Sequence, residues 1–333
     1  MRLARRTDAV LGERWDVPRD REPSEEIDDL GARFARGEIA LGADAARALR
    51  GDAAREGMTH LELAPGVRMM AVRTPTLPPA THTNVFVVGD RDAVLVEPAT
   101  PYDDELDRIA EWIGSLEGEG VVPGAILLTH HHVDHVGGAR ALAQALDLPL
   151  LAHAETAARL PRGITIERLI GDGERIELGT TALRAVHTPG HAPGHLCFVE
   201  ERSGVMIAGD MVAGTGTILV EPGDGDMQQY LDSLRRMAAE RPSALAPAHG
   251  GVLRPPGLVL ERYVEHRLAR EGKVRAALEG FPGGATAGEL VPIAYADAPP
   301  AVWPIARLST EAHLIKLEAD GLARREHDRW FPS

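Results

Sequence analysis

Residues 61–252 alternate between short apolar runs and amphipathic stretches, a pattern typical of strands and helices in succession. Runs rich in β-branched and apolar residues, bounded by Gly or Pro, predict strands at 61–72, 81–89, 93–98, 125–129, 149–153, 181–187, 195–201, 204–210 and 243–249. A turn within 167–179 predicts a hairpin there. Apolar residues at helical spacing predict helices at 102–116, 139–146 and 226–240. We therefore expect two mixed sheets between layers of helices.

A second pattern begins after the break at Pro255-Pro256-Gly257. Beyond it, a long helix, a shorter helix, a third helix and a β-ribbon are predicted in turn, at 258–278, 285–297, 301–320 and 322–331. This order is that of a winged helix. The predicted domains are thus an N-terminal appendage of unassigned role at 1–57, a larger domain of two mixed sheets at 58–256 and a winged-helix-like domain at 257–333.

Composition and charge narrow the class of protein. The chain of 333 residues has a formal net charge of −14, and so acidic a surface disfavours non-specific attraction to nucleic acid and to anionic membranes. A single cysteine, Cys197, excludes a disulfide framework and a Cys-rich zinc module. Neither a secretory signal nor an apolar run long enough for a membrane span is visible, so we expect a cytoplasmic protein with no membrane partner.

The stretch THHHVDH at 129–135 follows the apolar run at 125–128. In a loop that leaves a strand, alternate side chains turn inward, so His130 and His132 can converge on one point. Asp134 and His135 can serve a second point nearby, whereas His131 faces the other way. A His-rich surface loop, or a helix capped by Asp134, would explain the stretch without a metal. Mixed nitrogen and oxygen donors suit Zn²⁺ or Fe²⁺, and this favours a metal site.

Three later strands also end in a metal-binding type of residue. His191 follows the strand at 181–187, Asp210 ends the strand at 204–210, and His249 ends the last strand of the region. Any one of them alone would more often be a turn or core residue. Because four separate strand ends deliver His or Asp, we predict a dinuclear metal site.

These motifs, THHHVDH, HTPGH, AGD and PAHG in that order, resemble the metallo-β-lactamase superfamily over residues 61–252. The resemblance implies an α/β fold, the αββα sandwich. It implies two divalent metals, with zinc expected and iron or manganese as alternatives. The implied ligands are His130, His132 and His191 at the first metal and Asp134, His135 and His249 at the second, with Asp210 bridging the two.

Two positions near these motifs are assigned supporting roles. TPGHAPGH offers a second histidine, His195, which we place in the pocket or behind the ligands, because the motif aligns with His191. The superfamily often has Asp after its early strand, whereas this chain has Glu97, whose longer carboxylate can still brace a ligand histidine. Thr215 and Tyr230 are the remaining pocket candidates.

A closer resemblance covers about 61–326. The segments GDMVAGTGTILVEPGDGDMQQYLDSL, PAHGG, YVEHRLARE, ELVPIAYAD and AHLIKLEADG are similar to the lactamase-β-like-protein-2 group, which has a C-terminal winged helix. That group includes a single-strand endoribonuclease. Related sequences of the same architecture include acyl-carrier-protein thioesterases of polyketide pathways. The resemblance is specific for architecture and leaves the substrate open.

The implied chemistry is hydrolysis by a metal-bound hydroxide. Two metals lower the pKa of a bridging water from about 15.7 toward 7, and Asp134 is the catalytic residue expected to orient this water and accept its proton. Our first hypothesis is a small-molecule acyl substrate, namely a thioester, lactone or ester, which the acidic surface favours. Cys197 lies in a predicted strand and is expected to be a small core residue, so no cysteine nucleophile is expected.

Two other enzyme classes and a binding role are the alternatives to this hypothesis. RNA is the alternative substrate, supported by Arg324, Arg325, Arg329 and Trp330 in the predicted wing, although a solvated hairpin with a packed Trp explains the same residues. A mononuclear-iron oxygenase acting on a thiol or persulfide is disfavoured by the complete second set of ligands. A DNA-binding role is disfavoured because the helix at 301–320 has few basic side chains. We expect the winged helix to close the pocket or to form a homodimer.

Overall fold

The computed structural model describes residues 60–333, so the appendage predicted at 1–57 lies outside the described residues and stays a prediction. Seven strands form the first sheet in sequence order: β1 (Leu61–Ala64), β2 (Val67–Arg73), β3 (His82–Gly89), β4 (Asp92–Val96), β5 (Val122–Leu127), β6 (Leu150–Ala152) and β7 (Arg168–Leu169). Strands β1 to β4 pair antiparallel, and β4 to β7 pair parallel.

A second sheet has five strands in the order β12-β11-β10-β9-β8. Its members are β8 (Arg175–Glu177), β9 (Ala182–His187), β10 (Leu196–Glu200), β11 (Val205–Gly209) and β12 (Ala244–Pro247). Only β11 and β12 pair parallel within it. The two sheets face each other across a core that includes Phe86, Leu127, Phe198 and Ile207.

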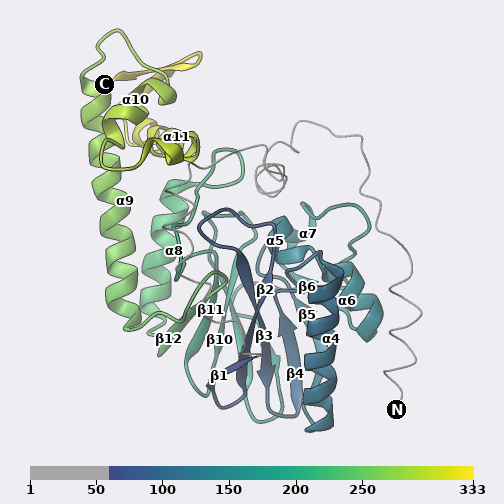
Figure 1. Cartoon of the computed structure of the whole chain (residues 1–333). Coiled ribbons are helices and arrows are strands. Elements are labelled where there is room, and N and C mark those ends of the chain that lie inside the picture. Colours follow the sequence, from purple (N-terminus) through teal and green to yellow (C-terminus); the bar gives the residue numbers. More distant parts are fainter. Residues whose placement is uncertain (1–59) are drawn as a thin grey trace.

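Helices cover both outer faces (Figure 1). On the first sheet, α4 (Asp103–Gly118) and α6 (Ala139–Leu146) pack through Ile109 and Leu142, while α5 (Val133–Val136) and α7 (Ala154–Ala157) are short. On the second sheet, α8 (Met227–Ala239) and the start of α9 (Pro256–Glu279) pack through Leu234 and Leu260. The architecture is therefore the expected αββα sandwich, and the predicted fold class is confirmed.

Two details of the strand prediction are wrong. Residues 61–72 do not form one strand, because the Pro65-Gly66 turn, with Gly66 at φ 77°, splits them into β1 and β2. Residues 167–179 do not form a hairpin either. Strand β7 pairs with β6 and β8 pairs with β9, so this turn carries the chain from one sheet to the other. Local turn signals cannot distinguish the two outcomes.

The C-terminal part has the expected order of elements. After α9 come α10 (Ala287–Ala294), the 3₁₀ turn η3 (Pro300–Val302), α11 (Trp303–Ala319) and the ribbon of β13 (Ala323–Glu326) and β14 (Arg329–Pro332). Their core includes Leu278, Leu290, Leu314 and Trp330. Helix α9 serves both cores, with Leu260 in the sandwich and Leu278 in this one. Within residues 60–333, no helix is long and apolar enough to cross a bilayer.

Candidate metal centre and substrate cavity

Three histidine nitrogens face one another beyond the ends of β5 and β9. His130 Nε2 lies 3.0 Å from His132 Nδ1 and 3.2 Å from His191 Nε2, and the last two nitrogens are 3.0 Å apart. When three nitrogens bind the same zinc ion at about 2.0–2.1 Å in tetrahedral geometry, they are separated by similar distances. The three ligands assigned to the first metal are thus brought together.

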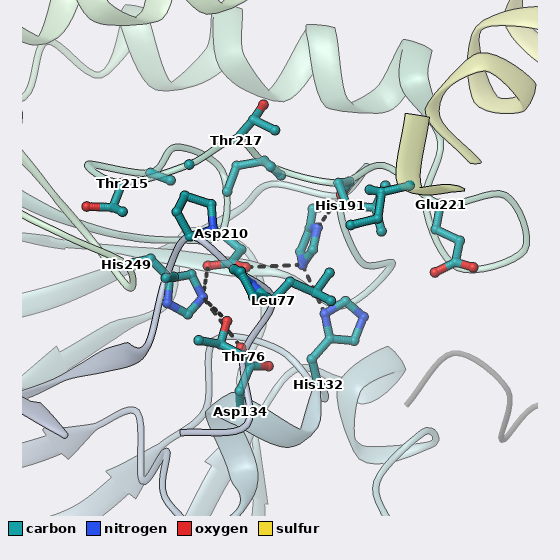
Figure 2. Close-up of a pocket in the computed structure, with 18 of the residues that line it drawn as sticks. Thr76, Leu77, His132, Asp134, His191, Asp210, Thr215, Thr217, Glu221 and His249 are labelled. Carbon is teal, nitrogen blue, oxygen red and sulfur yellow. Dashed lines mark hydrogen bonds and ion pairs between the residues drawn. The ribbon is translucent and has the colours of Figure 1, made fainter. Parts of the chain in front are cut away.

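A second set lies beside the first. His249 Nε2 is 3.5 Å from Asp134 Oδ2, and His135 Nε2 is 3.6 Å from Asp134 Oδ1. Asp210 lies between the two sets, with its carboxylate 3.3 Å from His249 Nε2 and 3.7 Å from His191 Nε2 (Figure 2). The same carboxylate is 3.6 Å from His135 Nε2. The structure therefore places Asp210 where a bridging ligand would stand.

The outer ring nitrogens of all five histidines are engaged by oxygen acceptors. His191 Nδ1 donates to Leu219 O at 2.8 Å, and His249 Nδ1 donates to His82 O at 2.9 Å. The other three outer nitrogens donate to Glu97 (from His135), to Asp224 (from His132) and to Thr129 Oγ1 (from His130). In the neutral rings the proton is thereby held on the outer nitrogen, and a lone pair points inward.

Converging lone pairs and carboxylates repel one another unless a cation or protons lie between them. His135 Nε2 and Asp210 Oδ1 are moreover buried without a hydrogen-bond partner, which would be costly in a site built for no ligand. The described residues therefore fit a pair of divalent cations, in the two sets that the sequence predicted. Metal identity and number stay predictions.

Glu97 holds both sets at once, in the role predicted for it. This fully buried residue follows β4 and accepts from His135 Nδ1 at 3.0 Å and from the hydroxyl of Thr129, which in turn accepts from His130. Its φ of 64° is unusual for a residue with a side chain. Such a conformation costs on the order of 1–3 kcal/mol and concentrates at functional sites.

His195 is buried beneath Asp210 and is not placed as a ligand. Its Nε2 accepts from the Asp210 amide at 3.1 Å, while Nδ1 is 2.8 Å from Thr188 Oγ1. His195 therefore orients the backbone of the bridging position, in agreement with the prediction that it supports the site. His131 also lies outside both sets, with Nε2 3.4 Å from Asp224 Oδ1.

In the absence of a cation, the pKa values of the ligand histidines depend on which of them lie beside a carboxylate. Burial lowers the pKa of His249, but Asp210 and Asp134 outweigh it and raise this pKa to about 9. Burial also lowers the pKa of His135, but Asp134 and Glu97 outweigh it and hold this pKa well above its usual value. In the first set, burial and the neighbouring rings hold the pKa of His130 well below its usual value, whereas Asp224 outweighs burial and raises the pKa of His132. At pH 7, His135 and His249 are thus protonated in the metal-free protein.

We expect metal binding at the second set to release protons. A cation must displace the protons of His135 and His249, which are bound at pH 7 because their pKa values are raised. Zinc affinity at this set should therefore rise with pH until about pH 9. Calorimetric zinc titrations at pH 7, repeated in buffers of different ionisation enthalpy, measure the protons released. Uptake of two zinc ions with no net proton release would contradict this expectation.

Sequence reasoning missed Asp224. Its carboxylate accepts from His132 Nε2 at 2.8 Å and lies in the loop before α8. The EPGDGD segment carries no spacing signal that links it to a histidine almost a hundred positions earlier. The contact of His191 with Leu219 O could not be predicted either, because every residue type has a backbone carbonyl.

An open cavity of about 290 Å³ lies over the metal centre, and His132, Asp134, His191, Asp210 and His249 form its floor. Its walls come from the loop at 75–80, the segment at 213–221 and the C-terminal domain, which supplies Val302, Ile305 and Ser309. Thr215 lines the cavity, as predicted. The winged helix thus contributes residues to the pocket wall, while closure of the pocket and a homodimer stay predictions.

The pocket role predicted for Tyr230 is wrong. Tyr230 is fully buried in the core under α8, and its hydroxyl donates to Met211 O at 2.8 Å. Arg267 lies over its ring, with the guanidinium carbon 5.1 Å from the ring centre. Tyr230 lies on α8, and the helix turns this face toward the second sheet. Tyr230 therefore holds the backbone of Met211, the residue after Asp210, and does not line the cavity.

Family models match both parts of the chain. The model described as Metallo-beta-lactamase superfamily covers residues 78–249, which include every predicted ligand. The chain belongs to the metallo-β-lactamase superfamily. A second model, Beta-lactamase associated winged helix domain, covers residues 286–330. The chain is thus an enzyme of a superfamily whose members are typically metal-dependent hydrolases, and its two-domain architecture, predicted by resemblance, is confirmed.

Individual superfamily members agree with this assignment. The Beta-lactamase-like protein 2 homolog of Drosophila melanogaster is 29% identical over 73% of this chain and 84% of its own length. Lactamase-like protein vrtG of Penicillium aethiopicum is 32% identical over 72% and 76% of the two chains. A solved beta-lactamase domain protein from Burkholderia ambifaria has a TM-score of 0.72 at 23% identity, covering 82% of this chain and 93% of its own. This last likeness supports the fold alone.

Proposed function

We propose that this protein is a dinuclear-metal hydrolase of a small acyl substrate, namely a thioester, lactone or ester. The two ligand sets at the floor of one cavity carry the proposal. Two divalent cations held there would lower the pKa of a water toward about 7 and polarise the scissile carbonyl. Asp134 and Asp210 both reach the cavity. Asp134, at the start of α5, is placed to orient the attacking water and accept its proton.

The walls of the cavity favour an acyl compound over a polyanion. Within the described residues, no Lys or Arg lines the cavity, whereas Glu221 and Asp224 do. Leu77, Ile218 and Ile305 provide apolar surface instead. A phosphodiester would meet acidic side chains without a compensating cation other than the metals, while an uncharged acyl group would be desolvated against apolar walls.

The wing that supported the RNA alternative is engaged within its own domain. Trp330 is 1% exposed and belongs to the core, so it cannot stack on a base. Arg324 pairs with Glu326, Arg325 donates to His327 O at 2.9 Å, and Arg329 donates to Gly284 O at 2.6 Å. Lys316, on the helix predicted as a possible DNA reader, is buried and donates to Glu271 and Asp320. These contacts favour a packed hairpin and helix over a nucleic-acid surface.

The iron-oxygenase alternative requires a single metal. Asp134, His135 and His249 lie within ligand distance of one another, which supports a second site. A metal content of two zinc ions per chain would agree with hydrolysis. One iron per chain together with oxygen consumption would contradict the hydrolase proposal. A homodimer stays a prediction.

The decisive experiment is a side-by-side assay of the purified protein on acyl-thioesters, lactones and single-stranded RNA. We expect hydrolysis of at least one acyl class, and a loss of about 10²–10⁴-fold in Asp134→Ala. Asp226→Ala is the matched control, because Asp226 caps α8 and contacts no predicted ligand. RNA cleavage that Asp134→Ala abolishes, with no acyl hydrolysis, would overturn the acyl proposal.

We further expect Ile305→Trp to shorten the acyl groups that are accepted. Ile305, on α11, lines the cavity, so a larger side chain there should lower kcat/KM for long acyl chains by about tenfold or more and spare short ones. Ile315→Trp is the control, since Ile315 lies on the same helix, is exposed and does not line the cavity. Kinetics over a series of acyl lengths measure the effect. An equal loss at all lengths would contradict it.

A further inference from the structure

One segment, residues 218–224, holds two of the three first-set histidines from behind. Leu219 O accepts from His191 Nδ1 at 2.8 Å, and Asp224 Oδ2 accepts from His132 Nε2 at 2.8 Å. Both bonds engage the outer nitrogen and aim the inner one at the ligand position. The ring orientation of the first set therefore depends on a segment distant from THHHVDH in the sequence.

The same segment is tied to the C-terminal part of the chain. Arg267, on α9, is 4% exposed and its guanidinium donates to Ile218 O. Helix α9 continues from there into the winged-helix core through Leu278. A continuous series of contacts thus runs from α9 through Ile218 and Leu219 to His191.

Asp224 could alternatively serve as a ligand of a third cation, because His131, His132 and Asp224 lie close together. Two observations argue against this role. Asp224 Oδ2 already accepts the N–H of His132, and Arg159 Nε lies 3.8 Å from Asp224 Oδ1. The positive charge of the Arg159 guanidinium would repel a metal ion bound at Asp224. Asp224 is therefore better explained as an acceptor that orients His132.

We propose that Asp224 is a positioning residue for the first metal, and that Arg267 couples the C-terminal domain to the same metal through residues 218–224. Partners behind a ligand histidine fix the tautomer and orientation of its ring, and their loss typically costs about 10–100-fold in metal affinity. The proposal does not depend on the substrate. A failure of acyl hydrolysis would leave it standing.

Zinc affinity tests the role of Asp224 without an activity assay. In a His249→Ala background, which weakens the second set, competition with a chromophoric chelator should report the first set. We expect Asp224→Ala to lower its zinc affinity by about 10–100-fold. Asp224→Asn should restore much of the affinity, since an amide oxygen can still accept from His132. Cobalt binding gives a second readout, because a displaced His132 ring should change the visible absorption of bound Co²⁺.

Asp226→Ala is the matched control in the same background. Asp226 accepts from Gln229 N at 2.8 Å as the N-cap of α8, two residues from Asp224. Its replacement should lower the melting temperature and leave zinc affinity unchanged. Wild-type zinc affinity in Asp224→Ala, or an equal loss in Asp226→Ala, would overturn the positioning role.

Arg267→Lys and Arg267→Met test the coupling. Both should lower first-set zinc affinity in the same direction as Asp224→Ala, and Lys should lower it less because its ammonium can still donate to Ile218 O. Should Arg267→Met fail to fold, Arg267→Lys carries the test alone. A folded Arg267 variant with wild-type affinity would refute the coupling and leave the Asp224 role in place.

Discussion

Replacing Asp210 by Ala should abolish hydrolysis and remove metal from both sets. Its carboxylate stands within 3.3–3.7 Å of ring nitrogens from both sets, where a single side chain can contribute to both metals. Loss of a residue that only supports a ligand costs about 10–100-fold. For the bridging position itself we expect at least about a 10³-fold fall in kcat/KM, together with a lower zinc content by elemental analysis.

Removal of Asp210 also takes one carboxylate partner from His135 and from His249, while Asp134 stays beside both rings. Since burial lowers the pKa of both rings and Asp210 opposes it, the pKa of His249 should fall from about 9 in the metal-free variant. Proton NMR of the histidine rings measures this independently of activity. Wild-type turnover by a folded Asp210→Ala protein would refute the proposed metal centre.

Gly209→Ala should unfold or severely destabilise the protein. Gly209 has φ 49°, and a Cβ there would lie 2.4 Å from His195 Nε2. A left-handed conformation costs an L-residue about 1–2 kcal/mol, and forced overpacking adds about 1–3 kcal/mol. We expect a loss of about 2–5 kcal/mol in the free energy of unfolding, measured by urea denaturation.

The same substitution should impair metal binding, because His195 accepts the amide proton of Asp210. Gly272→Ala is the control, since Gly272 lies within α9 and a Cβ there meets nothing within 4 Å. Helix propensity predicts that Gly272→Ala is neutral or stabilising by up to about 1 kcal/mol. A Gly209→Ala protein as stable as wild type would show that His195 can move away at little cost.

Local patterns predicted most of the fold, because each strand and helix carries its own apolar periodicity. They failed where partner choice decides the outcome. The Pro65-Gly66 turn makes a hairpin of two strands, whereas the turn between β7 and β8 joins two sheets, and both have similar turn residues. Which strand a segment pairs with depends on surfaces distant in sequence.

The residue types at strand ends, by themselves, determined which side chains could bind a metal. THHHVDH, His191, Asp210 and His249 were identified because donor side chains follow apolar runs, and the resemblance to the superfamily sorted them into two sets. Parallel pairing of β4 with β5 and of β11 with β12 explains why those strand ends meet at one edge.

Glu97, His195 and Thr215 were predicted beside the ligands from the sequence, and tertiary structure alone decided the rest of their surroundings. Asp224 and Leu219 O reach His132 and His191 from a loop before α8, and Ile305 reaches the cavity from the C-terminal domain. Tyr230, by contrast, turns into the core. Ligands can be predicted from their type because few side chains bind metals. Supporting and wall positions accept many residue types or use backbone carbonyls, so only the packing of distant segments selects them.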